Sequence, residues 1–341
     1  MLALVGQAVN WAARKMTRFA VQNGTNVPGA GGWVQTCDSL EMWLCFAANG
    51  GLPSVEDLGW GMQNSDYQLN VGLFSIGLDT YWPQFPELRE KLVSFTQQVA
   101  QKLGNTGAQV TNLGLIDSPE KSLLAGHEFR KADVDIIFLY VTTYALSSTV
   151  LPAVRRAKVP VVILNLSPGP AINYAAFNRL KDRRQMTGDW LAYCQACPVP
   201  EIANVFHRCR IPFFQVTGML ENDPMAAAEI AEWVAAARVA HAMEHNRLGV
   251  MGHYYGGMLD IYSDLTQQCA HFGGHIEILE VEELSALRRD VGDAAVNRRV
   301  AEFRTCFDVE PDCSEDELRR AARTSLALDR LVETHSLSSL A

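Results

Sequence analysis

The sequence is poor in long apolar runs, in cysteine and in secretory features. Runs such as VDIIFLYV, residues 134–141, are far shorter than the ~20 apolar residues that a membrane-spanning helix needs, so no span is expected. Eight cysteines in 341 residues are too sparse for a disulfide scaffold. The start of the chain also lacks the small-residue cleavage site of a secretory signal. We therefore expect a reducing, cytoplasmic setting.

An excess of positive charge is also absent. The formal net charge is -9, and no run of like charges forms a binding tail, so neither nucleic acid nor an anionic membrane is an expected partner. A small molecule or another protein fits this composition better. With 48% hydrophobic residues, the chain can bury the cores of two domains.

Phosphate-binding glycine motifs are missing as well. The stretch GLDTYW, residues 77–82, lacks the glycine spacing of a dinucleotide fold, and no GxxxxGK[ST] occurs, which argues against nucleotide binding. Cys194 and Cys197 have zinc or redox spacing, but no second cysteine pair matches them, so we expect ordinary buried or site-lining thiols. His253, Asp260 and Asp264 lack the spacing of known metal motifs. These residues favour a hydrogen-bonding pocket. Two alternatives stay open: His253 is a loop histidine bound to backbone groups, and Asp260 and Asp264 are carboxylates exposed to solvent.

The first 70 residues differ from the rest of the chain. No acidic residue precedes Asp38, and residues 8–22 can be drawn as a basic amphipathic helix, as in some organelle-targeting peptides. The alternative is an unrelated extension. We treat residues 1–70 as a separate N-terminal extension.

From Val71 onward, apolar strands alternate with amphipathic helices. The helix from residue 118 begins with Ser118 as its N-cap and Pro119 at its first position. Strands that are apolar on both faces and alternate with helices predict a parallel sheet covered by helices. The expected strands are residues 70–78, 108–117, 134–141 and 159–166, and the expected helices are 85–103, 118–132 and 147–158.

A second α/β pattern follows. It comprises a helix capped by Asn222 or Asp223, a strand at 247–252, a helix at 259–273 and a strand at 275–281. The remainder is expected to be helical with one break near Pro311 and a capping signal at residues 313–318. The predicted domains are thus 71–188 and 189–341.

Loops after the strands are the expected ligand site, because parallel sheets bind ligands beyond the carboxyl ends of their strands. These loops are rich in tyrosine, tryptophan, threonine, asparagine and aspartate, and poor in basic residues. Aromatic faces pack on C–H surfaces while amides and carboxylates bind hydroxyls. The pattern favours a neutral polyhydroxylated ligand such as a sugar.

Four segments together resemble the L-arabinose isomerase family, in its arabinose isomerase-like branch within the fucose/arabinose isomerase group. They are VGLFSIGLDTYWPQFPELREKL, residues 114–166, MTGDWLAYCQACPVPEIANVFHR and NRLGVMGHYYGGMLDIYSDLTQ, and the resemblance extends over residues 71–341. It implies a Rossmann-like N-terminal domain, a central α/β domain and a C-terminal barrel-like domain. It also implies a homo-oligomer that interconverts aldoses and ketoses, with a divalent metal, typically manganese, polarising the sugar oxygens.

The family's metal ligands, two glutamates and two histidines, belong to a region beyond the last residues here, so we expect a truncated chain without the barrel-like domain. None of these ligands can be assigned, and the catalytic residues stay unknown. Glu277 and Glu280 lie along a predicted strand and Glu201 follows a proline in an expected loop, so none replaces the missing ligands.

The resemblance also implies which side chains line the sugar site. Where the family carries a substrate-contacting histidine, this chain has Thr142, which leaves the sugar unnamed. Three interpretations stay open: an isomerase, a non-catalytic sugar-binding or regulatory protein, and a subunit that completes a site on a partner chain. The expected substrate-binding residues are Asp79, Tyr81, Trp82, Thr142, Thr143, Tyr144, Asn165, Gln195, Asn204, His253, Tyr254 and Tyr255.

Overall fold

The computed structural model describes residues 68–252, 257 and 263–341. Within them the chain forms two compact units, residues 68–241 and 242–341. The sequence places a boundary at residue 188 instead, and the reason for the difference is strand pairing, since the strand at Phe213–Met219 extends the sheet of the first unit. Both units are α/β structures built on parallel sheets, which confirms the expected fold class.

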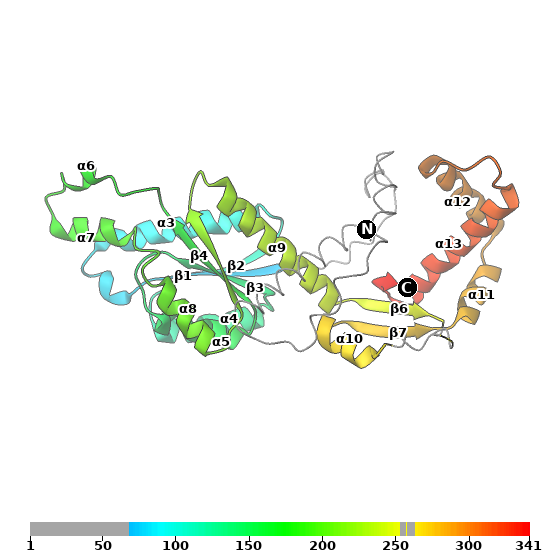
Figure 1. Cartoon of the computed structure of the whole chain (residues 1–341), viewed down its shortest axis with the longest axis horizontal. Helices are drawn as coiled ribbons and strands as arrows, with labels where there is room; N and C mark the ends of the chain where they lie inside the picture. The colour runs from blue at the N-terminus through cyan, green and yellow to red at the C-terminus, as the bar shows by residue number, and fades with distance from the viewer. Residues whose placement is uncertain (1–67, 253–256, 258–262) are drawn as a thin grey trace. The chain divides into compact units, whose positions relative to one another are not determined.

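The first unit contains a five-stranded parallel sheet in the order β2-β1-β3-β4-β5 (Figure 1). All six residues of β3 are buried, which explains its uninterrupted apolar sequence. The strands are β1 (Asn70–Ile76), β2 (Gln109–Ile116), β3 (Ile136–Val141), β4 (Val161–Ser167) and β5 (Phe213–Met219).

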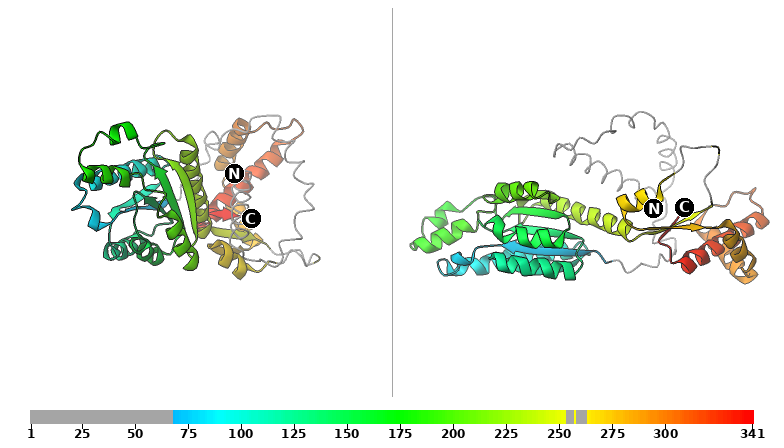
Figure 2. Two further views of the ribbon diagram at one scale, coloured as in Figure 1. Left: turned by 60° about the vertical axis from the view of Figure 1, so that its left-hand side comes forward. Right: turned by 90° about the horizontal axis from the view of Figure 1, so that it is seen from below.

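Helices cover both faces of this sheet (Figure 2). One core contains Val99 of α3 and Trp233 of α9 against one face, and the other contains Phe129 of α4, Val154 of α5 and Phe206 of α8 against the opposite face. The helices are α3 (Pro86–Gly104), α4 (Pro119–Lys131), α5 (Leu151–Ala157), α6 (Tyr174–Phe177), α7 (Arg183–Leu191), α8 (Val199–Arg208) and α9 (Pro224–Glu244).

Local capping signals in the first unit act as expected. The Ser118 hydroxyl accepts the Lys121 N–H at the start of α4. Asp223 accepts the N–H groups of Met225 and Ala226 at 3.1 and 3.0 Å at the start of α9. These bonds satisfy amide groups that have no partner inside the helix.

Two parts of the first unit were not predicted correctly from the sequence. β5 is not expected because its burial is irregular, with only Val216 fully inside. Glu201 is expected in a loop, and this is wrong. It lies in the first turn of α8, where Val199, Ile202 and Phe206 form a helical apolar face.

The second unit carries a three-stranded parallel sheet in the order β7-β6-β8. Helices α11, α12 and α13 share a small core around Val296, Val300 and Leu318. The capping box at Ser314 and Glu317 is confirmed. The elements are β6 (Arg247–Met251), β7 (His275–Leu279), β8 (Ser339–Leu340), α10 (Leu265–Phe272), α11 (Val281–Arg289), α12 (Asp293–Cys306) and α13 (Glu315–His335).

The end of the chain differs from the expected helical stretch with one break near Pro311. A second break separates α11 from α12, and the last residues pair with β6 as the short strand β8. Two residues are too few to show the alternation by which a strand is recognised. Within the described ranges, no helix is both long and apolar enough to cross a bilayer.

Candidate functional site

The strand order changes direction between β1 and β3. The chain leaves β1 toward β2 on one side and continues from β3 toward β4 on the other. In open α/β sheets, such a topological switch point is where ligands bind. The loops that follow β1 and β3 carry six of the predicted site residues.

The loop after β1 places two aromatic side chains at this edge. It forms the short helix η1 (Asp79–Tyr81), with Asp79 exposed at its start. The Tyr81 and Trp82 rings meet edge to face at 6.4 Å. The Trp82 indole N–H donates to Asp117 Oδ2 at 2.9 Å, so the ring is held against the end of β2.

Asp117, which was not among the predicted site residues, holds the loop after β1 in place through its hydrogen bond with Trp82. Its side chain is only 3% exposed and accepts the Lys121 ammonium at 2.6 Å. Burial alone raises the pKa of Asp117, but the hydrogen bonds from Lys121 and Trp82 outweigh it and lower the pKa below its ordinary value. A carboxylate directly after the end of an expected strand was the available signal.

The loop after β3 has an inner and an outer part. Thr142 and Thr143 are fully buried, and their hydroxyls donate to the Ile76 and Leu191 carbonyls, the second at 2.8 Å. Tyr144 is 43% exposed. Of these three predicted residues, Tyr144 is therefore the one whose side chain reaches solvent.

Gln195 connects this loop to the segment between α7 and α8. It is 1% exposed, and its amide N–H groups donate to the Thr142 carbonyl at 3.0 Å and the Ala192 carbonyl at 2.5 Å. Its Oε1 atom is buried without a hydrogen-bond partner. Unpaired buried acceptors are uncommon, because each carries a desolvation cost.

Tyr81, Tyr144 and Cys194 lie close enough to influence one another electrostatically. Burial, followed by the neighbouring Tyr144 and Cys194, raises the pKa of Tyr81. With raised pKa values, Tyr81 and Cys194 stay neutral near pH 7. The structure thus gathers Tyr81, Trp82, Tyr144 and Gln195 at one edge, as a largely uncharged wall.

Two other predicted residues lie outside this group. Asn165, on β4, donates to Thr217 Oγ1 of the neighbouring strand at 3.4 Å. Asn204 is exposed on α8, away from its buried residues Val199, Ile202 and Phe206. Neither residue has a contact that links it to the wall formed by the two loops.

The predicted residues His253, Tyr254 and Tyr255 lie outside the described part of the chain, and so does Asp260. Asp264 is described and caps α10, where its carboxylate accepts the Gln267 N–H at 3.0 Å. This capping bond accounts for Asp264 without a ligand.

Two acidic residues of the second unit, Glu277 and Glu283, are already bound to basic side chains. Glu277 accepts the Arg247 side chain and His335 Nδ1, the latter at 2.6 Å, while His335 Nε2 lies 2.7 Å from Glu283. Glu280 occupies the N-cap position of α11. In the first unit, Glu201 accepts the Ser147 hydroxyl at 2.5 Å.

Metal-ligating side chains do not cluster in the part of the chain that the structure describes. Over residues 68–252, 257 and 263–341, no group of three or more His, Cys, Asp or Glu side chains is placed to hold a metal ion. The described residues therefore do not fit the divalent metal that the family resemblance implies.

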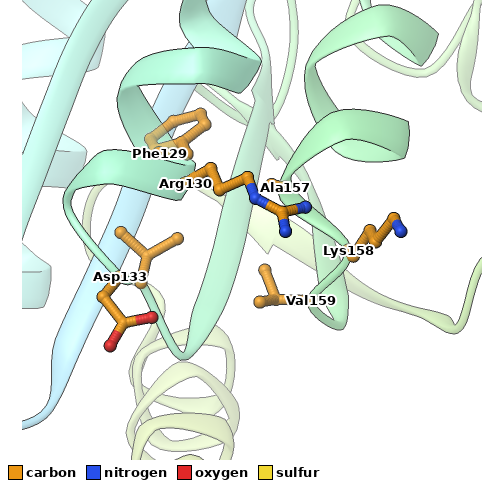
Figure 3. Close-up of a pocket in the computed structure, with 7 residues that line it drawn as sticks. Phe129, Arg130, Asp133, Ala157, Lys158 and Val159 are labelled. Carbon is orange, nitrogen blue, oxygen red and sulfur yellow. The ribbon is translucent and has the colours of Figure 1, made fainter.

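A pocket of about 290 Å³ lies elsewhere, between the ends of α4 and α5 (Figure 3). Its lining residues lie at the ends of α4 and α5 and in the loops that lead into β3 and β4. These loops lie at the amino edge of the sheet, opposite the switch point. Arg130 reaches toward Ala157, and Lys158 follows the end of α5. Cations at helix carboxyl ends complement the helix dipole, so this pocket needs no ligand to explain its charge.

The fold and the carboxyl edge of its sheet define a doubly wound α/β protein with an uncharged, aromatic wall at the switch point between β1 and β3. The chain is similar to an L-arabinose isomerase from Nocardioides sp. (strain ATCC BAA-499 / JS614), with 29% identity over 133 residues. The match covers 38% of this chain and 26% of that enzyme, so it spans about a quarter of the relative's length. No family model matches the chain. The expected resemblance is supported as a distant, partial one.

Proposed function

We propose that this chain is a sugar-binding protein of aldose–ketose isomerase type, which binds its sugar at the switch point between β1 and β3. The observation that carries the proposal is the partial similarity to an L-arabinose isomerase, together with the aromatic wall at that edge. L-Arabinose and its ketose, L-ribulose, are the first candidate ligands. By the same resemblance we propose a homo-oligomer.

The chemistry of the wall supports a neutral polyhydroxylated ligand. The Tyr81, Trp82 and Tyr144 rings offer flat apolar faces for sugar C–H groups, and the tyrosine hydroxyls and the Asp79 carboxylate can exchange hydrogen bonds with sugar hydroxyls. Two cations act on Asp117: Lys121 is paired with it at 2.6 Å, and Arg89 lowers its pKa through charge alone.

The proposal assigns sugar binding to the described residues and no catalytic step. In aldose–ketose isomerisation a divalent metal polarises the two sugar oxygens. The described residues provide no ligand set for such an ion. Buried Thr142, Thr143 and Gln195 position the loop that presents Tyr144, and they need not touch the sugar.

Calorimetric titration of the full chain with L-arabinose and L-ribulose tests this proposal. We expect measurable binding, weakened about tenfold by Tyr144→Ala, which removes about 1.4 kcal/mol of contact. Tyr174→Ala is the matched control, because Tyr174 is 60% exposed on α6 and belongs to a different loop. The absence of heat with either sugar would contradict the proposal.

A manganese-dependent isomerase assay on the same protein distinguishes an isomerase from a non-catalytic sugar-binding protein. Turnover would mean that residues outside the described ranges supply the metal ligands and that the chain is an enzyme. Binding without turnover would identify a sugar-binding or regulatory protein.

A further inference from the structure

Cys194 and Cys197 lie in a tight turn between α7 and α8. The Cys197 N–H donates to the Cys194 carbonyl at 3.3 Å, which closes a four-residue turn through Gln195 and Ala196. Such a turn brings its end Cα atoms within about 7 Å. A disulfide requires Cα atoms no more than about 6.8 Å apart, so the backbone already has nearly the geometry of a bridge.

The two thiols differ in their environment. Cys194 is 3% exposed, whereas Cys197 is exposed, and both are free thiols in the structure. Burial, and then the neighbouring Cys197, raise the pKa of Cys194 to about 12, and the Cys194 thiol donates to the Trp190 carbonyl at 3.5 Å. An accessible sulfur that can attack a disulfide therefore lies within one turn of a buried thiol that can resolve the mixed disulfide.

The turn is also joined to the loop after β3. Gln195, the residue following Cys194, donates its side-chain amide to the Thr142 carbonyl at 3.0 Å. The turn is therefore hydrogen-bonded to the segment that carries Tyr144. This hydrogen bond connects the thiol pair to the proposed site.

We propose that Cys194 and Cys197 form a thiol–disulfide exchange site for low-molecular-weight disulfides such as glutathione disulfide. The Cys197 thiolate attacks the glutathione disulfide bond, forms a mixed disulfide and releases one glutathione thiolate. Cys194 then gives up its proton and attacks the Cys197 sulfur, which releases the second glutathione. Two protein thiols are oxidised, one disulfide is reduced, and the protons pass to the two released glutathiones.

Mass spectrometry of the full chain tests this step. Trypsin releases residues 185–208, which contain Cys194 and Cys197 and no other cysteine. After brief oxidation with glutathione disulfide and blocking of the remaining thiols, this peptide should be two hydrogens lighter, and dithiothreitol should reverse the change. The peptide of residues 305–319, with Cys306 and Cys313, is the internal control and should oxidise at least about tenfold more slowly.

Two variants test the order of attack. In Cys194→Ser the mixed disulfide at Cys197 has no thiol to resolve it, so one glutathione should remain on the peptide. In Cys197→Ser the peptide should stay unmodified, because Cys194 is buried. Equal oxidation of the control peptide, or glutathione on Cys194 in the Cys197→Ser chain, would overturn the proposal. The comparison of the two peptides in the unmodified chain does not depend on how either variant folds.

Discussion

Replacement of Thr143 by valine tests whether the buried threonines hold the site loop in place. The Thr143 hydroxyl donates to the Leu191 carbonyl at 2.8 Å and so joins the end of β3 to the end of α7. Valine has nearly the same shape but no donor. The Leu191 carbonyl still accepts the Cys194 N–H at 3.1 Å, so it would not be left without a partner. The expected loss is therefore that of one net hydrogen bond, about 1 kcal/mol, rather than the roughly 3 kcal/mol of an orphaned buried group.

Hydrogen exchange of the β3 amides measures this loss within the first unit alone. A decrease of about 1 kcal/mol should speed exchange from the globally protected β3 amides about fivefold. Thr187→Val is the matched control, because the exposed Thr187 hydroxyl binds Arg183 within its own helix. This change should alter stability by less than about 0.5 kcal/mol. Unchanged exchange in Thr143→Val would refute the reasoning, since the bond would then contribute nothing.

Two further predictions concern other parts of the molecule. Hydrogen bonds to carboxylates, first of all that of Glu283, raise the pKa of His335 above its ordinary 6.5. The stability from this ion pair is thus complete below about pH 6.5 and is lost as pH rises through the raised pKa, so melting temperature should fall over that interval and fall less in His335→Gln. In the first unit, a Cβ at Gly126 would lie 2.6 Å from the Cβ of Arg156. Gly126→Ala should therefore destabilise the chain by about 1–3 kcal/mol in urea unfolding, whereas Gly104→Ala, with open space around it, should not.

The elements with strong local signals were predictable from the sequence. β3 has six consecutive apolar residues, and Ser118 with Pro119 marks the start of α4. β5 and β8 were not predictable, because one is an edge strand with a single fully buried residue and the other has two residues. Their pairing depends on partners far along the chain.

The candidate site was predictable in position but less so in detail. A site at the carboxyl ends of the strands follows from the βα alternation alone. The direction of each side chain does not follow from this alternation, because it depends on which backbone carbonyls lie close to that side chain in the folded chain. Thr142 and Thr143 turn inward to such carbonyls, and Asp117 holds Trp82 from a different strand. These contacts join residues 35–66 positions apart, which local patterns cannot register.

Hydrogen-exchange footprinting with and without sugar tests the central claim most directly. With saturating L-arabinose or L-ribulose, the account predicts slower exchange in the loops after β1 and β3, residues 77–85 and 142–147. It predicts no change at the pocket formed by residues 129–134 and 157–159. Protection of that pocket instead, or of neither region at any sugar concentration, would contradict a sugar site at the switch point.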